Sequence, residues 1–149
     1  MTQATGNSGR ALYVALSTDG STFTDISGHA NSVEPDGGER SMGETHTAEG
    51  DTPIVTKGKR AAMNVKAKVI YTEATTGPHA LVKAAYEAGS ALYLRWAPLG
   101  NVSGGLQNTT SAGTVTTHPY QGVADVGDAK ALLLEFNLMA ASITQATIA

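Results

Sequence analysis

The chain has 149 residues, no cysteine and a formal net charge of −3 at pH 7. A chain of this length can bury one ordinary hydrophobic core, so we expect a single domain over residues 1–149. The lack of cysteine excludes disulfides and thiolate metal sites, so stability has to come from packing. No apolar run approaches the roughly 18 residues of a transmembrane helix, and the start lacks the features of a signal peptide. We expect a soluble protein made in the cytoplasm, with no membrane partner.

The N-terminal part of the sequence predicts a flexible arm followed by a β-hairpin. Residues 1–10 precede the first alternating segment and are expected to be flexible. From Ala11 to Leu16 apolar residues alternate as in a strand. The turn sequence Thr18-Asp19-Gly20-Ser21 follows. It is typical of a tight connection to a second strand, expected over Phe23–Ile26.

A long polar segment separates this hairpin from the next alternating strand. Between Gly28 and Thr56 the sequence is rich in glycine and has six acidic residues against a single basic one, Arg40. We predict a long loop or an extended hairpin over residues 37–56. A structureless stretch of this size is unusual in a compact domain, so the segment is either mobile or ordered by a partner.

The middle of the chain predicts one strand and one helix. Over residues 63–71 the apolar residues Met63, Val65, Ala67, Val69 and Tyr71 alternate with Asn64, Lys66 and Lys68. This alternation is typical of a strand with one buried and one solvated face. A helix is predicted over residues 77–89, because a proline stands in its first turn and Gly89 at its end. Its expected apolar stripe is Leu81, Ala84, Ala85 and Ala88.

The following segment predicts a strand, a loop and an irregular strand. Ala91–Ala97 alternates and is expected to be a strand in which Trp96 faces the core. Residues 101–113 are mostly Gly, Ser, Thr and Asn, so we expect a flexible loop. Thr114–Val126 is expected to be a strand interrupted at Pro119, at an edge or a bulge.

The clearest predicted strand covers Ala129–Ala140, and a final strand follows over Ile143–Ile148. The first has Leu132, Leu134, Phe136 and Leu138 on one side and Leu133, Glu135, Asn137 and Met139 on the other. Because both sides carry apolar residues, this strand requires cover on both faces. Another subunit is one source of that cover, which points towards assembly.

No arrangement of residues indicates catalysis, a cofactor or a metal. The four histidines lie far apart and lack the spacing of metal ligands. Gly6-Asn7-Ser8-Gly9 lacks the strand-to-helix context of a serine nucleophile, and Gly58-Lys59 lacks the rest of a phosphate-binding loop. The carboxylates between Glu34 and Asp51 lack the spacing of a calcium loop. We therefore expect a protein that is not an enzyme and has no cofactor.

The charge distribution argues against tight binding of nucleic acid. Affinity for phosphate comes from clustered Lys and Arg, which release counterions. The one dense basic cluster is Lys57, Lys59 and Arg60, and three charges fall short of a basic binding stripe. We interpret this cluster as the solvated start of a strand.

The order of these patterns resembles a known family over nearly the whole chain. The resemblance rests on the first strand Leu12–Leu16, the helix-to-strand unit Leu81–Leu94, and the closing pair Ala131–Leu138 and Ser142–Thr144. In these features the chain is similar to the major tail protein, or tail tube subunit, of long-tailed, siphovirus-type bacteriophages and related gene transfer agents.

This resemblance implies a mainly β fold, a β-sandwich or barrel of antiparallel strands with one flanking α-helix. It implies hexameric rings whose inner strands join into a continuous barrel, and which stack into a tube for the passage of DNA into the host. The partners would be further copies of the chain and other tail proteins: the tape measure, the terminator, and the baseplate or tip. Contact with DNA in the lumen would be transient and non-specific. The location would be the virion tail, after assembly in the cytoplasm of the bacterial host.

Two sets of residues are candidates for contacts between subunits. The first is the long polar segment, which would bridge neighbouring copies through Glu39, Arg40, Met42, Glu44, His46, Glu49 and Asp51. The second is one face of the Ala129–Ala140 strand, with Leu133, Glu135, Asn137 and Met139. A neighbouring subunit would cover apolar side chains and unpaired strand edges at these places.

Two other interpretations fit the same patterns. A capsid decoration or tail-completion protein would also be small, free of cysteine and self-associating. A monomeric β-sandwich binding module would share the alternation and the glycine-rich loops, but Trp96 is the only tryptophan, and sugar-binding platforms usually expose aromatic residues. Concentration-dependent filaments would distinguish the tube subunit from both.

Overall fold

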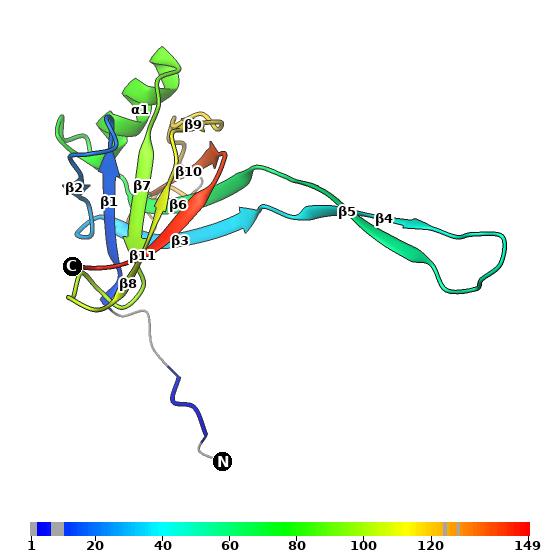
Figure 1. Cartoon of the computed structure of the whole chain (residues 1–149). Helices are drawn as coiled ribbons and strands as arrows, with labels where there is room; N and C mark the ends of the chain where they lie inside the picture. Colours follow the sequence, from blue (N-terminus) through cyan, green and yellow to red (C-terminus); the bar gives the residue numbers. More distant parts are fainter. Residues whose placement is uncertain (1–2, 7–10, 124, 128) are drawn as a thin grey trace.

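The computed structural model describes residues 3–6, 11–123, 125–127 and 129–149. These residues form eleven strands and one helix, arranged as a β-sandwich from which a long hairpin projects (Figure 1). The flexible N-terminal segment predicted over residues 1–10 falls largely outside the described residues. Residues 3–6 are exposed and have no regular secondary structure.

The sandwich consists of two antiparallel sheets. Sheet A has the order β11-β8-β7-β1-β2, and sheet B has the order β3-β6-β10-β9. The strands of sheet A are β1 (Tyr13–Ser17), β2 (Thr24–Asp25), β7 (Tyr93–Ala97), β8 (Leu106–Thr110) and β11 (Ile143–Thr147). The strands of sheet B are β3 (Ala30–Gly37), β6 (Met63–Ile70), β9 (Gly113–Val115) and β10 (Leu133–Ala140). We call the two sheets and the helix the body.

The hydrophobic core lies between the sheets, because the period of two along a strand turns every second side chain inward. The core side chains of β6 and β10 are at most 1% exposed: Val65, Ala67, Val69, Leu134, Phe136 and Leu138. Sheet A faces them with Val14, Leu16, Leu94 and Trp96. The expected fold, mainly antiparallel β with one helix, is confirmed, as is the core position of Trp96.

The helix α1 (Pro78–Ala88) lies at one end of the sandwich (Figure 1). It ends at Gly89, which adopts the left-handed conformation at a φ of 65°. The helix buries three side chains: Pro78, Val82 and Ala85. The predicted apolar stripe is therefore wrong in part, since Ala84 and Ala88 are exposed. Turning Val82 to the core buries more apolar area than turning an alanine there.

One segment predicted as a loop contains a strand. Residues 101–113 include β8, which pairs with β7 on one side and β11 on the other. Thr110 is 3% exposed, and its hydroxyl oxygen accepts a hydrogen bond of 3.0 Å from the main-chain N–H of Leu94. The prediction was wrong because the side chains of β8 are largely polar, whereas its main chain is satisfied by two ladders.

Two predicted strands are shorter than expected. The strand expected over residues 114–126 ends at Val115, ahead of Pro119, which has no N–H for a ladder; residue 124 lies outside the described residues. The strand expected over residues 129–140 begins at Leu133. Leu132, predicted on the buried face, therefore precedes the strand and is 38% exposed.

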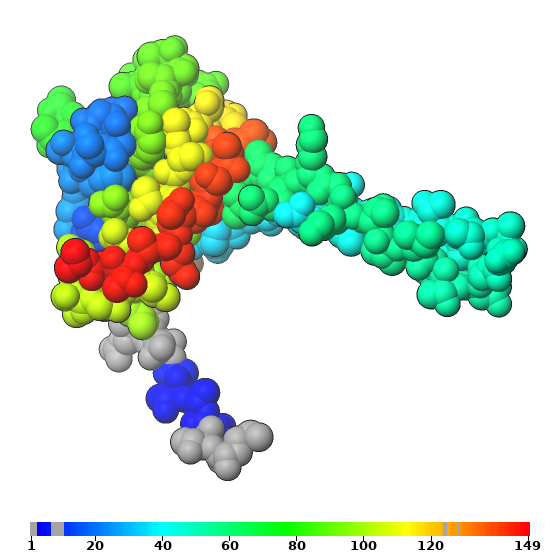
Figure 2. Space-filling view, viewed as in Figure 1, coloured from blue at the N-terminus to red at the C-terminus, as the bar shows by residue number. Residues whose placement is uncertain are grey.

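A two-stranded hairpin continues β3 and β6 beyond the body. Its strands are β4 (Arg40–Thr45) and β5 (Ile54–Arg60), which pair antiparallel. Figures 1 and 2 show the hairpin projecting away from the sandwich. We call residues 39–60 the arm. Of the two conformations that the sequence allowed for residues 37–56, the structure has the hairpin.

Candidate assembly surfaces

The arm is exposed along both of its strands. Every residue of β4 and β5 is exposed to solvent. Three of these side chains are large and apolar, with exposed fractions of 59%, 52% and 59%: Met42, Ile54 and Val55. An isolated two-stranded hairpin is at best marginally stable in water. The arm therefore offers a surface that a partner would stabilise.

Two glycines set the direction in which the arm leaves the body. Gly37 and Gly38 have φ angles of 81° and 72°, in the left-handed region that favours glycine. A Cβ on Gly37 would lie 2.6 Å from the carbonyl oxygen of Ala62. The Gly38 N–H donates to that same oxygen at 3.1 Å, and the Ala61 N–H donates to the Glu39 carbonyl at 2.8 Å. Main-chain hydrogen bonds thus continue from the body into the arm.

The predicted inter-subunit segment lies entirely on the arm. Its residues are all exposed and run from the base of the arm to its tip: Glu39, Arg40, Met42, Glu44, His46, Glu49 and Asp51. The Arg40 guanidinium donates a hydrogen bond of 2.9 Å to the Gly58 carbonyl, which fastens β4 to β5. The arm therefore presents a row of exposed side chains on a hydrogen-bonded hairpin.

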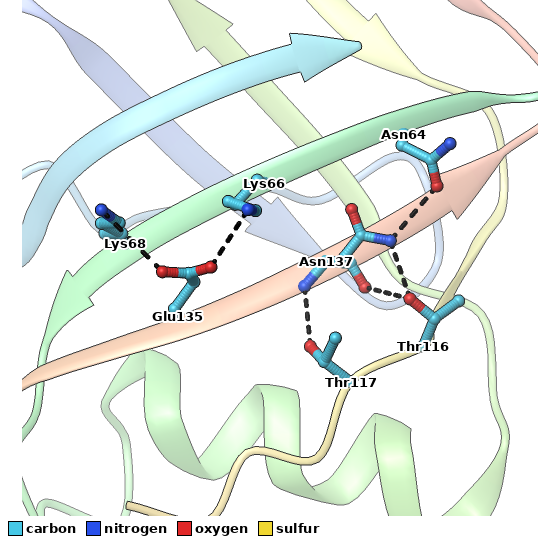
Figure 3. A network of polar contacts seen from close by, with 7 residues as sticks. All are labelled: Asn64, Lys66, Lys68, Thr116, Thr117, Glu135 and Asn137. Atoms are coloured by element: carbon cyan, nitrogen blue, oxygen red, sulfur yellow. Dashed lines mark hydrogen bonds and ion pairs between the residues drawn. The ribbon is translucent and has the colours of Figure 1, made fainter. Parts of the chain in front are cut away.

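The outer face of sheet B carries a carboxylate that is paired with two lysines. Glu135 on β10 lies between two lysines of β6 (Figure 3). Its carboxylate oxygens are 3.3 Å from the Lys66 Nζ and 3.8 Å from the Lys68 Nζ. Because these side chains are 37–50% exposed, such pairs stabilise a fold by roughly 0–1 kcal/mol. Their main effect is to neutralise charge on this face.

Asn137 connects β10 to its neighbours on both sides. Its side-chain nitrogen donates to the Asn64 Oδ1 at 3.2 Å and to the Thr116 Oγ1 at 2.7 Å (Figure 3). Its main-chain N–H donates to the Thr117 Oγ1 at 3.0 Å. The segment after β9 therefore stays attached to the sheet, although the strand itself ends at Val115.

Leu133 and Met139 flank this polar centre and are 38% and 45% exposed. The structure thus places the four predicted strand-face residues on the outward side of β10: Leu133, Glu135, Asn137 and Met139. It does not bring them together with the residues of the arm, because the arm projects away from the body (Figure 2). The two sets form separate surfaces.

Sequence reasoning missed part of both surfaces. Glu34 and Asp36 of β3 lie opposite Lys66 and Asn64 and so share the outer face of sheet B. The alternation within β3 was the available signal, but the surrounding glycines and acidic residues made this segment look like a loop. On the arm, the exposed side chains of Ile54 and Val55 were missed, as were the partners of Asn137. These partners depend on strand register, which the sequence does not show.

Each sheet ends in edge strands in the described part of the chain, although Gly113 of β9 already exchanges main-chain hydrogen bonds of 3.0 Å with Leu92. The edges of sheet B are β3 and β9, and those of sheet A are β2 and β11. Edge strands present main-chain N–H and C=O groups that another chain can pair with. Because the two edges of sheet B differ in sequence and length, pairing between them would join copies head to tail.

The turn between β1 and β2 contains a carboxylate with unusual titration. The Thr22 and Ser21 N–H groups and the Ser17 hydroxyl donate to Asp19 Oδ1, each at 2.9 Å. These hydrogen bonds lower the pKa of Asp19 to about 2. All three donors belong to the turn or to the last residue of β1, so we assign this carboxylate a structural role.

The described ranges contain no group of three or more His, Cys, Asp or Glu residues placed to hold a metal ion. Among the same residues, no helix has the length and apolar character needed to cross a membrane.

No family model and no curated protein matches the sequence, but solved structures share the fold. A chain in the sheath/tube terminator of the PVC extracellular contractile injection system, in the extended state, is 13% identical with a TM-score of 0.71, covering 98% of this chain and 100% of that one. A chain in the tube-terminating cap of the anti-feeding prophage is 12% identical with a TM-score of 0.63, covering 99% and 94%. A chain in the tail of an empty GTA particle is 14% identical with a TM-score of 0.64, covering 97% and 100%. At identities this low, the structural likeness establishes a common fold and no more.

Proposed function

We propose that the protein is a structural component of a phage-type tail, in which copies form hexameric rings that stack into a tube. The observation that carries this proposal is the likeness over nearly the whole chain to a chain of a sheath/tube terminator and to one of a GTA tail. The GTA tail is described with C6 symmetry, which supports six copies per ring. The proposal extends to siphovirus-type virions and gene transfer agents, with tape measure, terminator and baseplate or tip proteins as partners, and with assembly in the host cytoplasm.

In the proposed ring, the outer face of sheet B lines the channel. This face carries Glu34, Asp36 and Glu135 against Lys66 and Lys68, a net charge of −1 for each copy. Glu135 already pairs with both lysines. Because tight binding of phosphate requires clustered cations that are free to release counterions, such a wall would let DNA pass without retaining it.

The edges of sheet B support ring closure. β3 and β9 lie at opposite edges of the sheet, so β3 of one copy would pair with the β9 edge of the next. A contact between unlike surfaces is heterologous, and it closes into a ring when the rotation between copies closes. Pairing around the ring would also remove edges that otherwise favour uncontrolled aggregation.

Negative-stain electron microscopy of the purified protein across a concentration series tests this proposal. We expect hollow tubes or rings of uniform diameter above a threshold concentration, with a matching loss of monomer in analytical ultracentrifugation. A protein that is monomeric at every concentration by both methods would contradict self-assembly.

A second candidate function is tail completion, in which a single ring closes the end of a tube. Two of the similar structures are described as a tube terminator and a tube-terminating cap, which favours this candidate specifically. The same microscopy distinguishes the two functions. Rings that stack into tubes support the tube subunit, whereas uniform rings that never stack support a completion protein.

A further inference from the structure

The charged side chains of the arm are segregated along its length. The outer half of the arm, residues 43–54, carries three acidic residues and no Lys or Arg: Glu44, Glu49 and Asp51. The inner half, residues 39–42 and 55–60, carries one acidic residue and four basic ones: Glu39, Arg40, Lys57, Lys59 and Arg60. The outer half therefore has a net charge of −3 and the inner half a net charge of +3.

The charges of the arm stand apart from the ion pairs of the body. No ion pair among the described residues includes a side chain of the arm, since the pairs lie at Glu135 and Glu87 in the body. Ten residues of extended strand span roughly 30 Å, whereas interactions between exposed charges are screened beyond about 8 Å. Glu49 and Asp51, at the tip, are therefore too far from Arg40 and Arg60, at the base, to neutralise them, whereas Glu44 lies diagonal to Lys57 on one face of the hairpin.

Apolar side chains lie where the two halves meet. The register pairs Met42 with Lys57 and Glu44 with Val55, so Met42 and Val55 share one face of the inner half. Ile54, in the outer half, lies on the other face. Both halves therefore offer exposed apolar area as well as charge. A contact that covered this area would gain from the hydrophobic effect in addition to charge pairing.

We propose that the outer half of the arm of one copy binds the inner half of the arm of the neighbouring copy. This contact rests on the proposed function, since the ring supplies the neighbour. Unlike halves attract whereas like halves repel, so the charges select a head-to-tail order of arms. Head-to-tail contact is heterologous and suits a closed ring or an open helical stack.

Charge reversal separates this contact from other effects of the arm. The outer-reversed variant carries Glu44→Lys, Glu49→Lys and Asp51→Lys. The inner-reversed variant carries Lys57→Glu, Lys59→Glu and Arg60→Glu. The double-reversed variant carries all six changes and is the matched control, because it restores complementary halves with the signs exchanged. All six positions are exposed, so each variant is expected to fold, which circular dichroism verifies.

Each singly reversed variant has two halves of the same sign and is expected to repel itself. The threshold concentration for assembly, followed by light scattering and microscopy, should rise at least about tenfold, as expected for the loss of several exposed ion pairs. An equimolar mixture of the two variants should recover the wild-type threshold to within about threefold, because each outer half then meets an inner half of opposite sign. The double-reversed variant should assemble alone.

The outcomes separate the arm contact from the tube function. If the wild type forms tubes and a singly reversed variant does so at the same threshold, the arm contact is wrong and the tube function stands. A mixture of folded variants that fails to assemble also overturns the arm contact. If the wild type forms neither rings nor tubes, the tube function fails, and low-salt size-exclusion chromatography of the mixture decides the arm contact. Co-elution as species larger than a dimer supports it, while separate elution or a dimer alone contradicts the head-to-tail order.

Discussion

The strands of the body and those of the arm differ in how far their side chains are buried. In the body, β6 and β10 bury every second side chain, and Phe136 and Leu138 reach 0% exposure. The chain runs from β5 into β6 through a short joint, yet every residue of β5 is exposed. The difference lies in what covers the strands, since sheet A packs against sheet B, whereas the described part of the chain leaves every residue of β4 and β5 exposed. The body is therefore expected to be stable alone, and the arm to depend on neighbours.

The largest expected effect comes from placing a charge in the body. Leu138→Lys would bury an ammonium group at a site with 0% exposure and should cost about 4 kcal/mol or more in the free energy of unfolding. Because small domains are stable by only about 5–15 kcal/mol, this variant should be partly or wholly unfolded. Denaturant titration followed by circular dichroism measures the loss.

The adjacent residue provides the matched control. Met139 is 45% exposed, so Met139→Lys should change the free energy of unfolding by no more than about 0.5 kcal/mol. An unchanged assembly threshold would agree with a face that lines the channel, whereas a raised threshold would show that a neighbouring subunit covers Met139. A strongly destabilised Met139→Lys monomer would show instead that this side chain supports the body. Leu133→Lys tests the other end of the strand in the same way.

Removal of the arm should abolish assembly without unfolding the body. Deletion of residues 41–51 takes away all of β4 except Arg40, together with the tip of the arm, and none of the deleted residues belongs to the core. We expect a folded monomer with a cooperative denaturation curve, and no rings or tubes by microscopy. Thr47→Ser is the control, because it leaves the hairpin and its charges in place and should assemble. Normal tubes from the deletion variant would remove the arm from the assembly mechanism.

A change at the joint between body and arm should have an intermediate effect. Gly37→Ala places a Cβ 2.6 Å from the Ala62 carbonyl oxygen and requires a φ of 81°. The left-handed conformation alone should cost about 1–2 kcal/mol. Relief of the clash would also turn the arm, so the assembly threshold should rise together with the loss of stability. Gly28→Ala is the control, since a Cβ there meets nothing within 4 Å. Equal thresholds in the two variants would show that the direction of the arm is unimportant.

The difference in burial between the body and the arm also explains which strands the sequence could predict. β6 and β10 were predictable because one face of each meets the core and the other meets water or a polar surface, which creates a period of two. The arm was ambiguous because both of its faces meet solvent, so hydrophobicity carries no period to read. β8 was missed for a related reason, since polar side chains conceal a strand that main-chain hydrogen bonds hold on both sides.

The candidate surfaces were predictable to different degrees. Alternation alone placed Leu133 and Met139 on one side of β10. It could not show that Glu135 meets two lysines or that Asn137 reaches Asn64, because these contacts depend on register between distant segments. The charged residues of the arm are visible in the sequence. Their separation into a basic base and an acidic tip depends on the hairpin, which puts the ends of residues 39–60 at the base of the arm and their middle at its tip. The role of both surfaces in assembly stays a prediction.

The smallest expected effect tests a feature of the body that should not influence assembly. The pKa of Asp19 is lowered from 3.8 to about 2, because the Thr22 and Ser21 N–H groups and the Ser17 hydroxyl stabilise the carboxylate. A group whose pKa is lowered by folding contributes stability that is complete above its unfolded pKa, and this contribution is lost as the pH falls from about 4 to about 2. Asp19→Asn should therefore be less stable than the wild type near neutral pH, and the two denaturation midpoints should converge as the pH approaches about 2. Because the carboxylate is exposed, the difference should be small.

The assembly threshold of Asp19→Asn at neutral pH should not move, since the turn lies in the body and not on the arm. Midpoints that stay parallel throughout this range would show that the hydrogen bonds to Asp19 do not stabilise the fold, and a raised threshold would place the β1–β2 turn at a contact between subunits.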